Sequence, residues 1–499
     1  MGNFLGIDLG TTFSAISYID ETGRPKIIPN SDGKNITPSV VAEKKGKLEV
    51  GTDYSVKTWS VNPKMAASRF KREMSNQSKL YKIGKKEYSP AELSSFILKK
   101  LVQDSSEIID EIEEVVVTIP ANFANEAREA TMQASKLAGL DVNYIINEPT
   151  SAALYYAFNK GQELSGNYAV YDLGGGTFDI SIIKVVGQDI EIISSNGIEK
   201  CGGDDFDKAI FEIVSEKYTE ATGKEIDATQ FSLVDAEEEK KALSSRDKTL
   251  AQVGDELIQI TKEEFENKIK PLVLQARLLC ESTLEESGLN SEDIKEVFLS
   301  GGSTRIPLVR SSISEVFGKE PTSTINVDEV VALGASLYAA YKGDRSKLGA
   351  AAKASIDQIS VKEATSKCFG TLFMEFDEMV NAWGKKNAVL IERGDKIPTS
   401  ITQTFFTMAD YQESIELEVT ESVSKEEDPR FVKIIWEGNL QLKNPDSVRR
   451  GDEVKVTFSY DDNQIMNCKF QYKDEEFVEV DLSMVEKNES DEISNIEIL

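Results

Sequence analysis

The sequence predicts an α/β domain made of two duplicated lobes, followed by an all-β domain. Three observations support this fold class. A glycine-containing turn between two apolar strands occurs twice, in residues 4–17 and again in residues 168–184. Strand-like and helix-like segments alternate over the first 343 residues, which is typical of α/β proteins. After residue 358 the apolar residues alternate singly with polar ones, as in half-buried antiparallel strands.

The central turn contains three consecutive glycines between Asp172 and Thr177. Glycines let the backbone approach a ligand closely, so that N–H groups point at an anion. Taken alone, the pattern fits a glycine-rich β-hairpin equally well. The second copy, around Asp8, repeats Asp-Leu-Gly and Thr-Phe at an interval expected of duplicated lobes. The pair therefore favours two facing cradles that clamp a nucleoside triphosphate and its metal.

The first domain is assigned to residues 1–343, and its elements follow from local patterns. Ser89-Pro-Ala-Glu92 is a capping box with proline at the first helical position, and apolar residues then recur at helical spacing. We expect short strands over 4–42, 115–120, 144–146 and from 297, helices over 125–138, 206–218 and 330–340, and a peripheral lobe over 222–275.

The rest of the chain divides into three parts. Residues 344–358 carry few large apolar groups and are interpreted as a linker with some helical tendency. Residues 359–485 are expected to form a β-sandwich, because Ile415 to Val419, Val454 to Phe458 and Met466 to Tyr472 alternate in polarity. Residues 486–499 form an acidic tail.

The composition excludes several classes of function. The net charge of −29 argues against nucleic-acid and anionic-membrane partners. There are no histidines, so imidazole bases and ligands are excluded and the chemistry must use carboxylates, lysine and a hard metal. The four cysteines are widely spaced, which predicts buried free thiols in a reducing cytoplasm. No apolar run is long enough to span a membrane.

The phosphate motifs point to a known family. No Walker loop is present, because Asn167 stands where its lysine would be required, and no G-x-G-x-x-G follows a strand. The chain instead resembles the 70-kilodalton heat-shock chaperone family in the order and spacing of its motifs. These motifs are Ile7-Asp-Leu-Gly-Thr-Thr12, Ile146-Asn-Glu-Pro-Thr150, Tyr171-Asp-Leu-Gly-Gly-Gly-Thr-Phe-Asp-Ile-Ser181, Gly202 to Asp207 and Ser300 to Pro307.

The resemblance implies an actin-like ATPase domain, duplicated from a ribonuclease-H-like unit, that uses ATP or ADP with Mg²⁺ and hydrolyses ATP slowly. Asp8 and Asp172 would hold Mg²⁺ largely through water. Lys71 would stabilise charge on the γ-phosphoryl group, while Glu148 and Thr177 would orient the attacking water. The other implied nucleotide-binding residues are Gly10, Thr11, Thr12, Gly174, Gly175, Gly176, Gly202, Gly203, Asp204, Glu237, Lys240, Lys241, Ser244, Gly301, Gly302, Ser303, Arg305 and Asp328.

Several of these residues also have a plain structural interpretation. Lys71 lies in the basic run Arg69 to Arg72, which on its own suggests a solvated surface. Glu148 fits an acidic first-turn residue of a helix. The face formed by Glu237, Lys240, Lys241 and Ser244 fits a surface ion-pair helix. For these residues the family resemblance favours the functional interpretation.

The second domain resembles the family's peptide-binding sandwich. The resemblance implies a groove for an extended apolar peptide lined by Phe405, Met408, Ile415 and Leu417, although alternation predicts burial of Ile415 and Leu417 in a core equally well. The implied partners are polypeptide clients, J-domain proteins and nucleotide-exchange factors.

The sequence departs from the family pattern in four places. Lys241 stands where the family usually has arginine, Tyr144 stands where an arginine contacts the linker, and residues 347–353 lack the linker's large aliphatic side chains. We also expect no helical lid after the sandwich.

Three hypotheses follow from these features. The first is a lidless ATP-hydrolysing chaperone. The second is a nucleotide-switched regulatory or assembly protein with one dedicated partner. The third is an actin-like small-molecule kinase, which would require an acceptor pocket in place of the β-domain.

Overall fold

The structure, a computed structural model, describes residues 3–481 with short gaps, and divides into the compact units Met1–Val361 and Lys362–Glu486. The predicted acidic tail at 486–499 lies outside the described residues. The gaps are residues 77, 161–164, 187–188, 199, 228, 323–325, 358–359, 363, 366, 378–380, 462–465 and 474–475.

The first lobe of the larger unit is built on a sheet with the strand order β11-β10-β1-β2-β3. Its central strand β1 pairs in parallel with β10 and antiparallel with β2. The side chains of helices α2 and α3 join this lobe's apolar core, and Ser89 caps α2 with the predicted capping box. The bounds are β1 (Asn3–Asp8), β2 (Phe13–Ile19), β3 (Pro25–Ile28), β10 (Ile112–Ile119), β11 (Tyr144–Asn147), α2 (Pro90–Ser105) and α3 (Asn125–Leu137).

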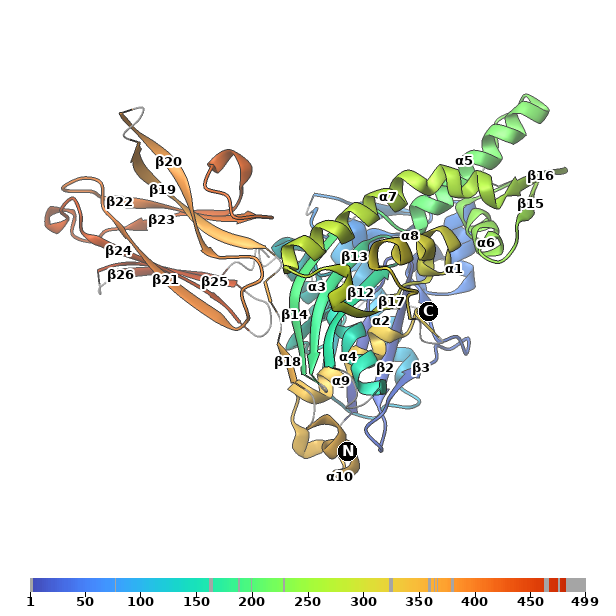
Figure 1. Ribbon diagram of the computed structural model, residues 1–499, viewed down its shortest axis with the longest axis horizontal. Coiled ribbons are helices and arrows are strands. Elements are labelled where there is room, and N and C mark those ends of the chain that lie inside the picture. The colour runs from blue at the N-terminus through green and yellow to red at the C-terminus, as the bar shows by residue number, and fades with distance from the viewer. Residues whose placement is uncertain are drawn as a thin grey trace. The chain divides into compact units, whose positions relative to one another are not determined.

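The second lobe repeats this plan. Strand β12 pairs in parallel with β17 and antiparallel with β13, in a sheet ordered β17-β12-β13-β14-β18 whose long strands lie side by side in Figure 1. The two glycine turns therefore occupy equivalent places, because each links a strand that has a parallel neighbour to the antiparallel strand on its other side. The bounds are β12 (Ser165–Leu173), β13 (Phe178–Val186), β14 (Asp189–Ile198), β17 (Ile294–Ser300) and β18 (Ser360–Lys362).

Smaller elements complete both lobes. In the segment predicted to be a peripheral lobe, β15 and β16 form a short antiparallel hairpin, and buried residues of this segment join the core of the second lobe. The remaining elements of the first lobe are β4 (Thr37–Pro38), β5 (Val40–Lys44), β6 (Lys47–Val50), α1 (Asp53–Val61), β7 (Ala66–Ser68), the 3₁₀ turn η1 (Phe70–Glu73), β8 (Tyr81–Ile83) and β9 (Lys86–Tyr88). Those of the second lobe are α5 (Gly203–Thr222), α6 (Leu233–Leu243), β15 (Lys248–Val253), β16 (Glu256–Thr261), α7 (Lys262–Ser287), η3 (Ser291–Asp293), η4 (Gly302–Arg305) and α8 (Pro307–Phe317).

Two buried helices, α4 (Glu148–Lys160) and α9 (Val330–Lys342), pack closely against each other; α9 also packs against the first sheet, whereas α4 contacts strands of both sheets. The close approach depends on two glycines. A Cβ at Gly334 of α9 would lie 1.8 Å from the carbonyl oxygen of Ser151, and one at Gly6 of β1 would lie 2.1 Å from the amide of Ser336. Real side chains do not tolerate such distances, so these positions require glycine.

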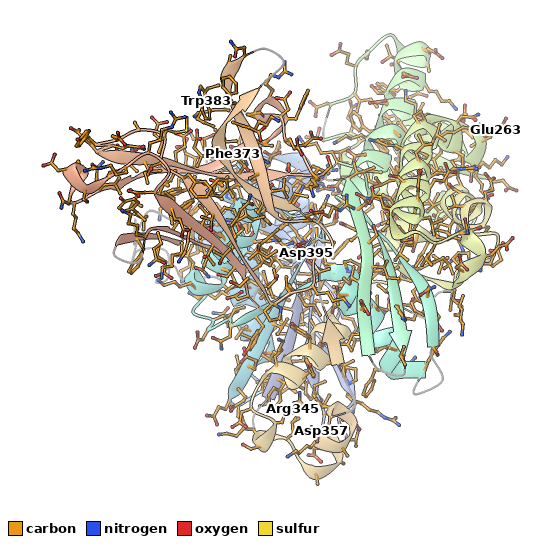
Figure 2. The ribbon with its side chains drawn as sticks, turned by 60° about the vertical axis from the view of Figure 1, so that its left-hand side comes forward. Glu263, Arg345, Asp357, Phe373, Trp383 and Asp395 are labelled. Carbon is orange, nitrogen blue, oxygen red and sulfur yellow. The ribbon has the colours of Figure 1, made fainter. Side chains whose placement is uncertain are left out.

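Much of the segment interpreted as a linker is helical. It contains η5 (Arg345–Lys347) and α10 (Ala350–Ile356), and an ion pair of 3.1 Å joins Arg345 to Asp357 (Figure 2). Ala352 and Ile356 of α10 are buried. Further along the chain, β18 extends the edge of the second sheet beside β14.

The second unit contains two four-stranded antiparallel sheets, ordered β20-β19-β22-β23 and β21-β24-β25-β26. Side chains of both sheets meet in one apolar core, which includes Val419 and Phe458. The bounds are β19 (Cys368–Asp377), β20 (Ala382–Ile391), β21 (Thr399–Phe406), β22 (Ser414–Ser422), η6 (Pro429–Phe431), β23 (Lys433–Gln441), η7 (Pro445–Ser447), β24 (Glu453–Tyr460), β25 (Met466–Tyr472) and β26 (Glu476–Asp481).

Two further expectations concern the whole chain. All four cysteines are buried and free, as predicted. No helix among the described residues is both long enough and apolar enough to cross a bilayer.

Candidate functional site

A cleft with a volume of about 380 Å³ brings the two glycine turns together in the larger unit. It is lined by all the residues that the sequence implicates in nucleotide and metal binding except Gly202. The lining residues from that set are Asp8, Gly10, Thr11, Thr12, Lys71, Glu148, Asp172, Gly174, Gly175, Gly176, Thr177, Gly203, Asp204, Glu237, Lys240, Lys241, Ser244, Gly301, Gly302, Ser303, Arg305 and Asp328.

Two carboxylates lie at the ends of β1 and β12, the strands that lead into the two glycine turns. Asp8 ends β1 and accepts a hydrogen bond of 3.3 Å from the hydroxyl of Thr118 on β10. Asp172, near the end of β12, accepts one of 3.0 Å from Ser300, which ends the parallel neighbour β17. Each lobe thus presents one carboxylate, and a hydroxyl on the adjacent parallel strand orients it.

Burial governs the electrostatics of these carboxylates. Removal from water, followed by the nearby charge of Glu148, raises the pKa of both Asp8 and Asp172. Burial likewise raises the pKa of Asp179, which faces Asp172 on β13. Such a concentration of buried carboxyl groups stabilises a bound cation, and oxygen donors of this kind suit Mg²⁺.

Lys71 is the buried cation of the site. It lies on η1, is 5% exposed, and its Nζ is 2.5 Å from Oε1 of Glu148, which is 7% exposed. Glu148 begins α4 immediately after β11. The solvated-surface interpretation of Lys71 therefore does not hold. A desolvated lysine beside two carboxylates can neutralise developing phosphoryl charge.

The two glycine turns touch each other. A Cβ at Gly175 would lie 1.9 Å from Oγ1 of Thr12, so the turns approach to a distance that only glycine permits. Within the turn, the N–H of Gly174 donates to the carbonyl of Thr177. The carbonyls of Gly174 and Gly175 accept from the N–H groups of Gly203 and Asp204, which begin α5. The glycine turn between β12 and β13 is thus held in place through its carbonyl groups.

The proposed nucleoside side is formed by α6 and η4. Lys240 is buried, and its Nζ lies 2.7 Å from Oδ1 of Asp207. Lys241 is about half exposed and pairs with Glu237 at 3.2 Å, as expected of a surface ion pair that also borders the cleft. Arg305 pairs with Asp328 at 2.8 Å.

Three polar residues of this region were missed by sequence reasoning. Arg69 and Arg72 contact Asp204 and Asp205 of α5, although the basic run containing them suggested a surface. Asp207 lines the cleft and holds Lys240. Its position three residues after Asp204, on the same face of a helix, was the available signal.

The four residues predicted to line a peptide groove divide into two groups. Leu417 is 4% exposed and belongs to the core of the second unit, and Ile415 packs against that core. Met408 is 38% exposed. Phe405 also packs against the core, and its ring lies 5.4 Å from that of Phe373, which Figure 2 labels.

This division predicts different effects of truncation. Leu417→Ala should lower the free energy of unfolding of the second unit by about 2–5 kcal/mol, because it leaves a buried cavity. Met408→Ala should change it by about 0.5 kcal/mol or less, as an exposed substitution does. Hydrogen exchange of β22 to β25 in the full chain measures both. Equal effects of the two substitutions would contradict the assignment of Leu417 to the core.

These features define a class, the two-lobed nucleotide-binding proteins in which paired glycine turns face a buried lysine and carboxylates. Comparison with known proteins identifies the family. The family model described as "Hsp70 protein" matches residues 4–83 and 50–498. A relative, "Chaperone protein DnaK" of Thermotoga neapolitana, is 36% identical over 482 residues, which are 93% of this chain and 77% of the relative. The chain belongs to the Hsp70 family, whose chaperones use ATP or ADP with Mg²⁺.

Proposed function

We propose that this chain is a chaperone that hydrolyses ATP slowly in the cleft between its two lobes and binds extended apolar peptide segments through its second unit. Membership of an ATPase chaperone family supports the broad activity. We further propose an actin-like fold for the first unit, a peptide-binding sandwich for the second, domain limits at 343 and 359, and a cytoplasmic location.

The observation that carries the hydrolytic proposal is the buried pair of Lys71 and Glu148 beside the carboxylates of both lobes. In this proposal Asp8 and Asp172 hold Mg²⁺ largely through water, and the bound cation supplies charge neutralisation for the phosphates. The N–H groups of Gly175 and Gly176 bind phosphate oxygens.

Three side chains orient the attacking water and stabilise the developing charge in this scheme. Glu148 and the hydroxyl of Thr177 orient the attacking water. Lys71 moves its hydrogen bonds from Glu148 toward the γ-phosphoryl oxygens as charge develops there. Release of Glu148 from the ion pair frees that carboxylate to accept a hydrogen bond from the water.

A second candidate is a nucleotide-switched regulatory or assembly protein with one dedicated partner. Its support is the segment 344–358, where a short helix with small side chains replaces the family's run of large aliphatic residues. Polypeptide clients, J-domain proteins and nucleotide-exchange factors are proposed partners of the chaperone, whereas this alternative requires only the dedicated one.

The test is the single-turnover rate of ATP hydrolysis by the full chain with and without unfolded peptides. The chaperone proposal predicts hydrolysis that requires Mg²⁺ and is accelerated by peptide. Normal hydrolysis without any peptide effect would favour the dedicated-partner alternative. Absence of hydrolysis with ATP bound would contradict both proposals and leave a nucleotide-binding scaffold.

A further inference from the structure

Two arginines on either side of Lys71 cross from the first lobe to the second. They lie at the 3₁₀ turn η1, whose Phe70 side chain is part of the first lobe's core. Their carboxylate partners, Asp204 and Asp205, are on α5, whose Phe206 side chain is part of the second lobe's core. The connections between the lobes therefore flank the residue proposed to stabilise the γ-phosphoryl charge.

Arg72 makes the more specific of the two connections. Its Nε and Nη2 donate to the carbonyl oxygen of Gly176 at 3.1 and 2.8 Å, and Nη2 also lies 2.6 Å from Oδ2 of Asp205. The side chain is 10% exposed. A planar guanidinium suits this geometry, because it can serve a carbonyl and a carboxylate at once. The third carbonyl of the glycine turn is thereby held from the opposite lobe.

Arg69 is held in place on both sides. Its φ of 61° is in the left-handed region, which is unfavourable for a residue with a side chain. Its guanidinium carbon lies 3.9 Å from the centre of the Trp59 ring, and its Nε lies 2.8 Å from Oδ1 of the buried Asp204. The ring and the carboxylate together stabilise this conformation. Separation of the lobes would therefore break the ion pair with Asp204 and leave only the contact with the Trp59 ring.

We propose that Arg72, assisted by Arg69, is a positioning residue that places Lys71 opposite the glycine turn only when the two lobes are closed. This inference rests on the proposed hydrolytic function of Lys71. Opening the cleft breaks the contacts of both arginines, frees the Gly176 carbonyl and removes the restraint on the backbone that carries Lys71. Closure of the cleft and assembly of the hydrolytic site are then one event.

The test compares Arg72→Met, Arg72→Lys and the control Arg24→Met, which replaces an exposed arginine of the same lobe. Arg72→Met should lower the single-turnover rate of ATP hydrolysis about tenfold, the effect of one charge-assisted hydrogen bond. It should also accelerate dissociation of a fluorescent ATP analogue about tenfold while the Kd changes by less than about threefold, because loss of the contact speeds entry as well as exit. Arg72→Lys should bring both rates only part of the way back to the wild-type values, because one ammonium group cannot reproduce the paired hydrogen bonds of the planar guanidinium.

The outcomes separate this inference from the proposed function. Arg72→Met with the hydrolysis and dissociation rates of the wild type would overturn the inference. Parallel losses of affinity, rate and melting temperature would also overturn it, because they indicate general damage to the fold. If the wild type binds ATP without hydrolysing it, the proposed function fails, and the dissociation rates still decide whether Arg72 holds the cleft closed.

Discussion

Replacement of Lys71 by methionine is expected to lower the single-turnover rate of ATP hydrolysis by at least about 100-fold, the typical effect of removing a group that stabilises transition-state charge. Nucleotide affinity should change far less, because the glycine turns and the α6 side of the cleft remain. The measurement is the rate of ADP formation from pre-bound ATP, together with the Kd of the complex.

Two further variants make this result interpretable. Removing Lys71 leaves Glu148 buried without its ion-pair partner, which destabilises a fold by about 3–5 kcal/mol. The double variant Lys71→Met with Glu148→Gln removes that unpaired charge and should regain stability but not activity. Lys57→Met, at an exposed position on α1, should hydrolyse ATP at the wild-type rate. A fully active Lys71→Met protein would rule out the proposed role of this lysine.

Gly334→Ala is expected to destabilise the larger unit by about 3 kcal/mol, although helix propensity alone favours alanine by about 1 kcal/mol. Packing outweighs helix propensity, so the substitution should lower the free energy of unfolding. The added Cβ would lie 1.8 Å from the Ser151 carbonyl oxygen, and both helices are buried. The measurement is the midpoint of urea unfolding of the full chain, followed by hydrogen exchange in α4 and α9.

Gly384→Ala is the matched control. A Cβ at Gly384 would meet no atom within 4 Å, so the same chemical change should alter stability by about 0.5 kcal/mol or less. A Gly334→Ala protein as stable as the wild type would show that α9 can move away from α4, contrary to the packing described above.

Local patterns predicted much of the fold. The capping box at Ser89 begins a helix, the helix predicted over 125–138 is α3, and the alternating segments from Ile415 onward are strands β22, β24 and β25. These features depend on neighbouring residues, which a sequence displays directly. The repeated glycine turn was equally visible, and its two copies occupy equivalent strand connections.

Features that depend on contacts between distant segments were not predictable. Nothing near Arg72 in the sequence indicates that its partner is the carbonyl of Gly176, and nothing near Gly334 indicates the proximity of Ser151. Alternation could not decide whether Leu417 faces a core or a groove, because either position is apolar on one side. Burial in the folded unit decides for the core.

The segment 344–358 shows the same limit. Its small side chains suggested a linker with some helical tendency, and most of it forms η5 and α10. The sequence did not indicate that β18 adds to the second sheet shortly afterwards. Strand addition uses backbone hydrogen bonds and therefore leaves little trace in side-chain pattern.

The most direct test of the central claim is a crystal structure of the full chain with Mg²⁺ and a non-hydrolysable ATP analogue. The account predicts that the triphosphate lies between the two glycine turns, with the cation facing Asp8 and Asp172 and the Nζ of Lys71 within hydrogen-bond distance of the γ-phosphate. Binding of the analogue outside this cleft, or in it with Lys71 still paired to Glu148 and distant from the phosphates, would contradict the account.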